Sequence, residues 1–180
     1  MSKSVLISIK PKYCKLIASG EKTIEVRKSR PKLKTPFKVY IYCSKDRGKL
    51  LEVIHDNDLY YNERYHGKPQ FIKAPNGDYP FRKCGKVIGE FVCDRIDVYR
   101  YNKDGYGIEN QNELLSLSCL SEKELYRYLQ GKKPHAWHIS DLIIYDTPKV
   151  LSDFTRCEPA VGSTFSLKRA PQSWCYVEEL

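Results

Sequence analysis

The chain has 180 residues, of which 41% are hydrophobic, and this size is typical of a single domain with a real core. No apolar run approaches the ~20 residues that a membrane-spanning helix needs. The first residues turn polar too quickly for a secretory signal. The net charge is +9, and residues 1–49 hold 14 Lys/Arg against 3 Asp/Glu, so the basic excess lies in the N-terminal quarter. Such a patch attracts polyanions such as RNA, with DNA as an alternative. A solvated basic surface without a ligand is the other interpretation, but the clustering of the charge favours nucleic acid.

The seven cysteines do not resemble a disulfide framework, because their number is odd and none forms a Cys-x-x-Cys pair. Scattered thiols of this kind are typical of a reducing compartment, so we expect a cytoplasmic protein. The one close histidine pair is His135 and His138, and on a strand this spacing sends the two rings to opposite faces. We therefore expect neither a metal site nor a cofactor.

The N-terminal residues predict a strand followed by a helix. Residues 5–9 are apolar and mostly β-branched, which favours a strand. Pro11 fits the first turn of a helix, and Gly20 fits its end. Between them Tyr13, Leu16 and Ile17 have the i, i+3, i+4 spacing of one helix face, so we expect a helix of about three turns.

The next stretch, residues 20–27, alternates polar and apolar residues as a strand does. Ile24 and Val26 would point toward a core, and the alternate residues from Thr23 to Arg27 toward the other face. That polar face either meets water or lines a pocket. The basic segment 28–36 follows, and its prolines exclude a central strand or a regular helix. We expect it to form a loop at the rim of a groove that follows phosphates.

The rest of the chain predicts an α+β domain that spans residues 1–180. Glycines at 85 and 89 indicate a bulge or a close backbone approach where a sheet bends. Because helices do not separate most of the strands, we expect a small, mostly antiparallel, partly closed β-barrel. We expect strands at 37–44, 85–99, 136–146 (stopped by Pro148) and 174–177, helices at 114–120 and after the Ser121-x-x-Glu124 capping box, and an insertion or long hairpin at 45–84.

Four residues in the order Gly-x-Lys-x-x-Glu-x-Arg carry a family resemblance: Gly20, Lys22, Glu25 and Arg27. A strand, a short helix ending in glycine and this motif on a second strand resemble the ASCH domains. Segments 85–91, 137–140 and 170–176 also resemble the larger phage and bacterial members. The resemblance implies a fold similar to the PUA domain and binding of RNA or a nucleotide in a cleft that the motif lines.

The same resemblance implies an enzymatic alternative. One small bacterial branch of the family is an amidohydrolase of N4-acetylcytidine that uses a lysine, a threonine and a glutamate, and some members are reported as ribonucleases. Lys22 matches the lysine, whereas Glu25 stands at the position of the threonine. The glutamate of that branch comes from the later helical region, where Glu113, Glu122 and Glu124 are the candidates. A hydrolase site in this chain would therefore use Lys22 and Glu25.

For a binding site, Lys22 and Arg27 are expected to contact a phosphate or a base edge, since arginine presents a planar fork of donors. Glu25 would accept from an exocyclic amine, and it would also hold Lys22 in a fixed ion pair, because a neighbouring carboxylate stabilises the ammonium. Trp137 or Trp174 could stack on a base, with core packing as the alternative. The predicted binding residues are Lys22, Glu25, Arg27, Lys28, Arg30, Trp137, His138 and Trp174. A third hypothesis is a protein-interaction module that binds an unknown partner through residues 45–84.

Overall fold

The computed structural model describes residues 2–45, 85–103, 107–157 and 164–180. Nearly all of the predicted insertion, residues 45–84, lies outside these ranges. The strands are β1 (Lys3–Ile9), β2 (Ile24–Arg27), β3 (Phe37–Cys43), β4 (Val87–Cys93), β5 (Ile96–Val98), β6 (His135–His138), β7 (Ser140–Lys149), β8 (Thr155–Cys157), β9 (Thr164–Ser166) and β10 (Trp174–Glu178). The helices are α1 (Pro11–Ala18), α2 (Gln111–Ser118) and α3 (Glu122–Leu129), with a 3₁₀ turn at Leu151–Asp153.

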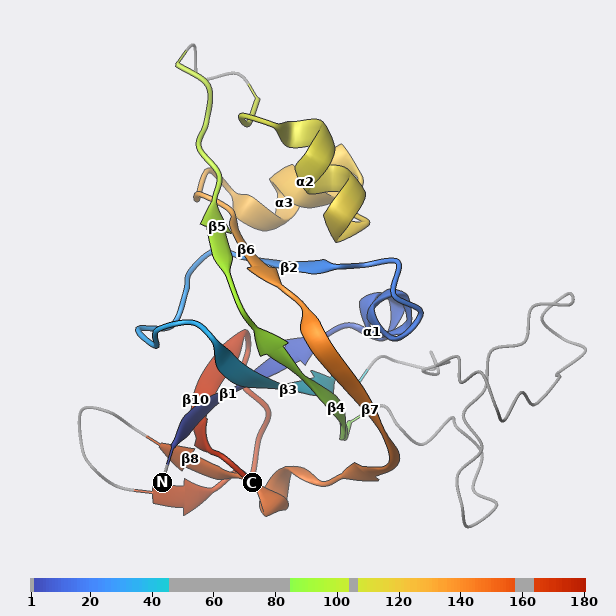
Figure 1. Ribbon diagram of the computed structural model, residues 1–180, viewed down its shortest axis with the longest axis vertical. Coiled ribbons are helices and arrows are strands. Elements are labelled where there is room, and N and C mark those ends of the chain that lie inside the picture. Colours follow the sequence, from blue (N-terminus) through green and yellow to red (C-terminus); the bar gives the residue numbers. More distant parts are fainter. Residues whose placement is uncertain (1, 46–84, 104–106, 158–163) are drawn as a thin grey trace, which may run out of the picture.

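Two sheets organise the described residues, as Figure 1 shows. The larger sheet has the order β7-β4-β3-β1-β10-β8-β9, and the smaller one has the order β2-β6-β5. Only the β1–β3 pair is parallel among the strand pairs of the described residues. The predicted α+β class and mostly antiparallel pairing are therefore confirmed. The expected barrel closure is not observed, because β7 and β9 stand at opposite ends of the sheet order in the part of the chain that the structure describes.

A bent two-stranded ribbon joins the two sheets. β4 and β7 pair within the large sheet, while their continuations β5 and β6 pair within the small one. The long strands predicted at 85–99 and 136–146 are thus each divided in two. The first predicted strand is interrupted at residues 94–95 and the second at Ile139. Close to the second interruption, the backbone of Asp141 lies in the left-handed region, with a φ of 46°. Pro148 does not end its strand, since β7 continues through Lys149.

The core has three parts, which follow from the alternation of side chains along the strands. Val39 and Ile41 pack on one face of the large sheet with α1, whereas Tyr40 and Tyr42 pack on the other. This division of β3 was predicted. The third cluster lies between the small sheet and the helices α2 and α3, and its buried members are Ile24, Val26, Ile108, Leu114, Leu125, Leu129 and Ala136.

Two of the helix ends predicted from the sequence are observed, at α1 and at α3. Pro11 stands in the first turn of α1, and Gly20 follows the helix with a φ of +76°, although α1 has eight residues and is shorter than the three turns expected. Ser121 and Glu124 form the predicted capping box of α3. α2 begins earlier than expected, at Gln111. Across the described ranges, no helix has the length and apolarity needed to cross a membrane.

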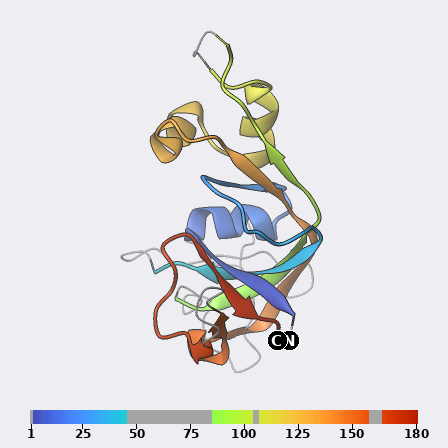
Figure 2. The same ribbon diagram turned by 90° about the vertical axis from the view of Figure 1, so that its left-hand side faces the viewer.

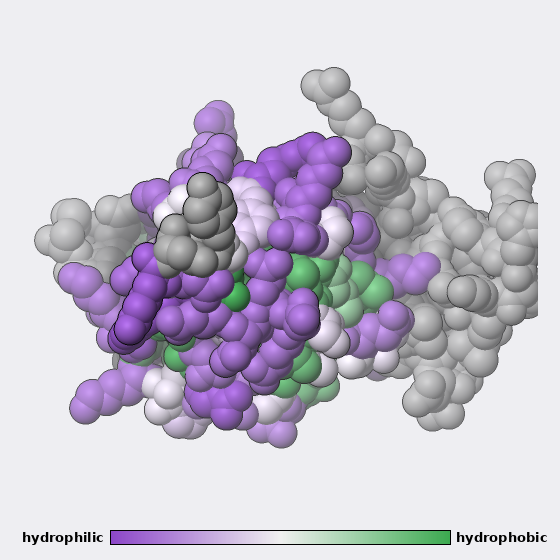
Figure 3. All heavy atoms as spheres, turned by 90° about the horizontal axis from the view of Figure 1, so that it is seen from above, coloured by the Kyte–Doolittle hydropathy of each residue, from purple (hydrophilic) through white to green (hydrophobic). Residues whose placement is uncertain are grey.

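The two chain ends lie close together at the foot of the molecule, opposite α2 and α3 (Figure 2). β1 and β10 run antiparallel, and Lys3 pairs with Glu178 in their register. The opposite end of the molecule presents a mostly hydrophilic surface over α2 and α3 (Figure 3). The region between these two ends holds the small sheet and α1.

We predict that Gly89→Ala destabilises the fold through a clash rather than through backbone strain. A Cβ at this position would lie 2.3 Å from the carbonyl oxygen of Ile143, at a register shift between β4 and β7. The free energy of unfolding should fall by about 1–3 kcal/mol, the usual cost of overpacking. Urea denaturation followed by circular dichroism would measure the change. An alanine variant with the midpoint of the wild type would contradict the close approach.

Candidate functional site

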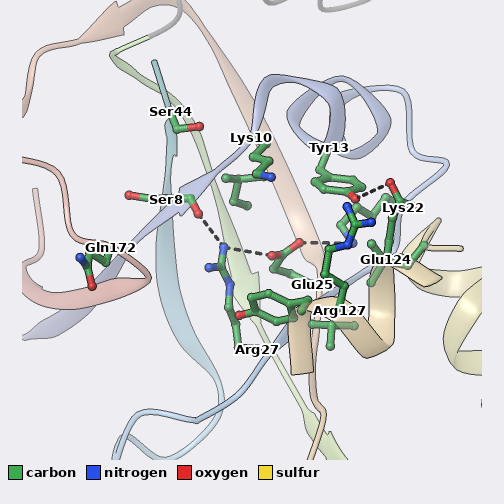
Figure 4. Close-up of a pocket in the computed structure, with 14 residues that line it drawn as sticks. Ser8, Lys10, Tyr13, Lys22, Glu25, Arg27, Ser44, Glu124, Arg127 and Gln172 are labelled. Atoms are coloured by element: carbon green, nitrogen blue, oxygen red, sulfur yellow. Dashed lines mark hydrogen bonds and ion pairs between the residues drawn. The ribbon is translucent and has the colours of Figure 1, made fainter. Parts of the chain in front are cut away.

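A cavity of about 460 Å³ lies where the end of β1, the helix α1 and the strand β2 face α3 (Figure 4). Its volume is within the range of small-molecule and cofactor pockets. Its lining combines the predicted motif with residues from four other parts of the chain. The lining residues are Ser8, Ile9, Lys10, Tyr13, Lys22, Glu25, Val26, Arg27, Ser44, Leu120, Glu124, Arg127, Tyr128 and Gln172.

Backbone hydrogen bonds on both sides hold the start of β2 in place. After α1 ends, the Lys22 N–H donates to the Leu16 carbonyl at 2.9 Å, and the Thr23 N–H donates to the Leu117 carbonyl at 3.0 Å. β2 then pairs antiparallel with β6. Because Ile24 and Val26 enter the third core cluster, the alternate residues of β2 face the cavity.

Three charged side chains, which we call the triad, form the floor of this cavity: Lys22, Glu25 and Arg27. Glu25 lies between the two cations, with Oε2 at 3.2 Å from Lys22 Nζ and Oε1 at 3.0 Å from Arg27 Nη2. The side chains are exposed by only 1%, 9% and 7%, respectively. A buried charge is costly unless it is paired and hydrogen-bonded, so each member depends on the others.

Each cation of the triad also donates to a backbone carbonyl of another element. Lys22 Nζ donates to the Ser118 carbonyl at 2.7 Å, at the end of α2. Arg27 Nη2 donates to the Ser8 carbonyl at 2.7 Å, near the end of β1. The predicted Lys22–Glu25 ion pair is therefore confirmed. In this arrangement Lys22 is a hydrogen-bonded ammonium, which suits a fixed donor better than a nucleophile.

A second bridge crosses the cavity between α1 and α3 and ends on Glu124. Glu124 Oε1 accepts from Lys12 Nζ at 2.9 Å and from the Tyr13 hydroxyl at 3.2 Å, and Oε2 accepts from the Ser121 backbone. The bonds from Ser121 and Lys12 lower the pKa of Glu124 to about 2. Burial, followed by the nearby charge of Glu124, raises the pKa of Tyr13 to about 12. The carboxyl is thus ionised and the phenol protonated at neutral pH.

Lys28 and Arg30 occupy different places at the rim. Lys28 Nζ lies 5.2 Å from the ring centroid of Tyr128, which lines the cavity, and donates to Gln130 at 3.1 Å. Arg30 is exposed and does not line the cavity. The structure thus places Lys28 beside Tyr128, outside the cavity lining, and leaves Arg30 on the outer part of the loop.

The predicted aromatic contacts need correction. Trp137 is completely buried and packs against Phe37 and Trp174, so it has no face to offer to a base. Trp174 is partly buried, and its Nε1 donates to Ser29 at 3.3 Å outside the cavity lining. Core packing, the alternative considered for both tryptophans, describes Trp137 well. The sequence pattern did not show that this strand crosses the centre of the core.

His138 lies on the face of the small sheet opposite the triad. It pairs with Ile24 in the register of β2 and β6, whereas Glu25 pairs with Trp137. Its Nε2 lies 2.7 Å from Asp97 Oδ2 and 3.1 Å from Arg95 Nη2. His138 is therefore part of a separate surface group and not of the cavity.

Several lining residues had no distinguishing sequence signal. Tyr13 was predicted only as a helix-face residue and Glu124 mainly as a helix cap, yet both reach the cavity. Arg127 and Tyr128 follow Glu124 by three and four residues, so they lie on the same side of α3. That spacing could have grouped them once Glu124 was placed. Lys10, Ser44 and Gln172 come from loops whose meeting depends on the tertiary fold.

Comparisons with known proteins agree with this architecture. A family model described as "ASCH domain" matches residues 7–138. The crystal structure of the ASCH protein from Zymomonas mobilis is similar to this chain with a TM-score of 0.54 and 18% identity, covering 98% of this chain and 88% of that one. A Tyr→Phe mutant of the same protein gives 0.56 and 19%, covering 99% and 92%, and a Ser→Ala mutant gives 0.56 and 19%, covering 98% and 89%. No curated protein matches the sequence.

We predict that Glu25→Ala costs far more stability than Lys12→Ala. The first substitution leaves two buried cations without their carboxylate and should lower the free energy of unfolding by about 3–5 kcal/mol. The second removes an ion pair whose lysine is 62% exposed, so it should cost less than about 1 kcal/mol. Chemical denaturation of both variants would measure the two costs. Equal losses would show that the triad does not support the cavity.

The α1–α3 bridge should depend on pH in the acid range. Because folding lowers the pKa of Glu124 from 4.5 to about 2, the carboxylate stabilises the fold above pH 4.5, and this contribution is lost as the pH falls toward 2. Glu124→Gln should therefore be less stable than the wild type near neutrality, and the difference in Tm should shrink on acidification. Because glutamine also completes a capping box, this substitution removes the charge of the side chain and keeps the cap. The difference should be small, because the side chain is 37% exposed. A difference independent of pH would contradict this role.

Proposed function

The chain belongs to the ASCH-domain family, and from this premise we propose that its cavity binds RNA or a nucleotide. The observation that carries the proposal is the surplus of hydrogen-bond donors and positive charge in the lining. Lys10, Lys22, Arg27 and Arg127 face the same space as only two carboxylates, Glu25 and Glu124. A nucleotide is rich in acceptors and negatively charged, so it complements such a lining.

The lining also supplies aromatic rings for a base. Tyr13 from α1 and Tyr128 from α3 both border the cavity. Unpaired bases stack on aromatic side chains and on guanidinium planes, which duplex bases cannot do. Arg127 is exposed on the same side of α3 as Tyr128. These residues replace the tryptophans as the proposed base contacts, and they favour a single-stranded or free nucleotide.

The triad defines the role of the family motif in this proposal. Because Lys22 and Arg27 are already bonded to Glu25 and to backbone carbonyls, we propose that they supply fixed charge beneath the ligand. Glu25 keeps lone pairs that accept from an exocyclic amine. Lys28 and Lys12, the exposed lysine of α1, then extend the positive rim outside the cavity.

One observation favours hydrolysis as the second candidate. Of the three candidate glutamates of the later helical region, Glu124 lines the cavity, so a carboxylate and Lys22 face the same space. A hydrolase of acylated cytidine or of RNA would use Lys22 as the donor and an ionised carboxylate as the base. Incubation with N4-acetylcytidine and with mixed RNA, followed by chromatography, tests this candidate. Turnover that persists in Lys22→Ala would exclude the site.

RNA binding should depend on salt and on Arg127. We expect short single-stranded RNA to bind in fluorescence anisotropy and to weaken steeply between about 50 and 200 mM salt, since phosphate contacts release counterions. Arg127→Ala should weaken binding by about ten- to a hundredfold without touching the buried triad, because a charge-assisted contact contributes roughly 1.5–3 kcal/mol. Lys123→Ala is the matched control, since it removes an exposed cation of the same helix that does not line the cavity.

Two results would contradict RNA binding in the cavity. If no RNA binds at low salt, the cavity does not serve nucleic acid. If Arg127→Ala and Lys123→Ala weaken binding equally, the RNA follows the general surface charge and does not enter the cavity.

A further inference from the structure

The positive charge of the cavity is not balanced along its length, and this imbalance indicates how a ligand is oriented. The triad contains two cations and one carboxylate, all at least nine-tenths buried. It therefore carries one net positive charge away from bulk water. Such a charge is unfavourable without a counterion, so the site favours an anion close to the triad.

The end of the cavity next to Lys22 is already compensated. The Lys22 ammonium contacts Glu25 and the Ser118 carbonyl, and it lies 5.3 Å from the ring centroid of Tyr13. The hydroxyl of Tyr13 in turn donates to the ionised Glu124. Negative and π-electron density thus surrounds this ammonium on several sides.

The end next to Arg27 is compensated less fully, because the guanidinium contacts Glu25 and one backbone carbonyl but has a donor left without a partner among the described residues. Within the part of the chain that the structure describes, Arg27 Nε has no hydrogen-bond partner, and Nη1 makes only a long contact of 3.4 Å to the Ser173 hydroxyl. The other terminal nitrogen, Nη2, contacts Glu25 and the Ser8 carbonyl. The surplus charge of the triad therefore lies at the guanidinium.

The residues around this end are donors that reach the cavity surface. Lys10 is exposed at the N-cap position of α1, where its ammonium adds to the positive end of the helix dipole. Ser44 and Gln172 line the same space. Figure 4 shows Ser8, Ser44 and Gln172 on one side of Glu25 and Tyr13, Glu124 and Arg127 on the other.

From this asymmetry we propose that the cavity contains a phosphate subsite formed by Lys10, Ser44 and Gln172 above the Arg27 guanidinium. The inference rests on the proposed function and gives it a direction: the phosphate lies at the Arg27 end, and the base lies toward Tyr13 and Tyr128. Lys10 and the polar groups contact the phosphate, while Arg27 supplies buried charge. The phosphate belongs either to a mononucleotide or to an internal phosphodiester of RNA.

Calorimetric titration of the full chain tests this subsite. The probes are the four ribonucleosides, their 5′- and 3′-monophosphates, and a tetranucleotide without terminal phosphates. We expect the phosphorylated ligand to bind at least about tenfold more tightly than the nucleoside, as a charge-assisted contact implies. Lys10→Ala should remove most of this gain, whereas Lys123→Ala should keep it.

The outcomes separate the subsite from the proposed function. A gain seen only with monophosphates identifies a terminal phosphate, and a Lys10 dependence seen only with the tetranucleotide identifies an internal one; either result supports the subsite. If nucleosides and phosphorylated ligands bind equally, or if Lys10→Ala has no more effect than Lys123→Ala, the subsite is wrong although the cavity still binds bases. If no probe binds, the proposed function fails together with it.

Ser44→Ala and Arg27→Lys extend the test. Ser44→Ala removes a surface hydroxyl without changing charge, so it should lower the phosphate gain while the far-ultraviolet circular dichroism stays unchanged. Arg27→Lys keeps one positive charge for Glu25 but loses the planar fork, and it should also reduce the gain. An unchanged phosphate gain in both folded variants would overturn the placement at the Arg27 end.

Discussion

Two buried cations share one carboxylate at the centre of this molecule, and the cavity exists because that arrangement ties three elements together. Lys22 reaches the last turn of α2, Arg27 reaches the end of β1, and Glu25 holds both. An ion pair of this kind is weak evidence for stability, since desolvation offsets much of its attraction. Its value here is positional, because the removal of Glu25 would leave two buried cations without their carboxylate.

The bent ribbon explains why the triad can face a cavity. The chain bends between β4 and β5 and between β6 and β7, so β5 and β6 lie in the small sheet and not in the large one. β2 belongs to the small sheet because it pairs with β6. β2 is thereby held against α2 and α3 by its apolar face and looks toward the end of β1 with its polar face. A sheet that closed through these strands would not provide two layers with α1 between them.

The sequence predicted the local features well and the long-range ones poorly. The alternation in β2 and β3, the stop at Gly20 and the capping box at Ser121 depend on neighbouring residues, so their patterns could be read directly. The role of Trp137 could not, because burial depends on which strands surround it. For the same reason Arg127 and Tyr128 of α3 were missed as cavity residues: α1 and α3 meet across more than one hundred residues of sequence.

The basic composition of the N-terminal quarter acquires a more specific meaning once burial is known. A charge count treats Lys22, Arg27 and Lys10 as equals, yet two of them are buried and one is exposed. The buried pair contributes little to solubility, because its side chains are only 1% and 7% exposed. Its charge acts instead on whatever enters the cavity, where the lower dielectric strengthens it. Glutamate at position 25 cancels half of this charge and fixes its geometry, so the motif presents one net positive charge in a defined place. A rigid, partly neutralised charge suits selective recognition of an anion better than it suits an activated lysine.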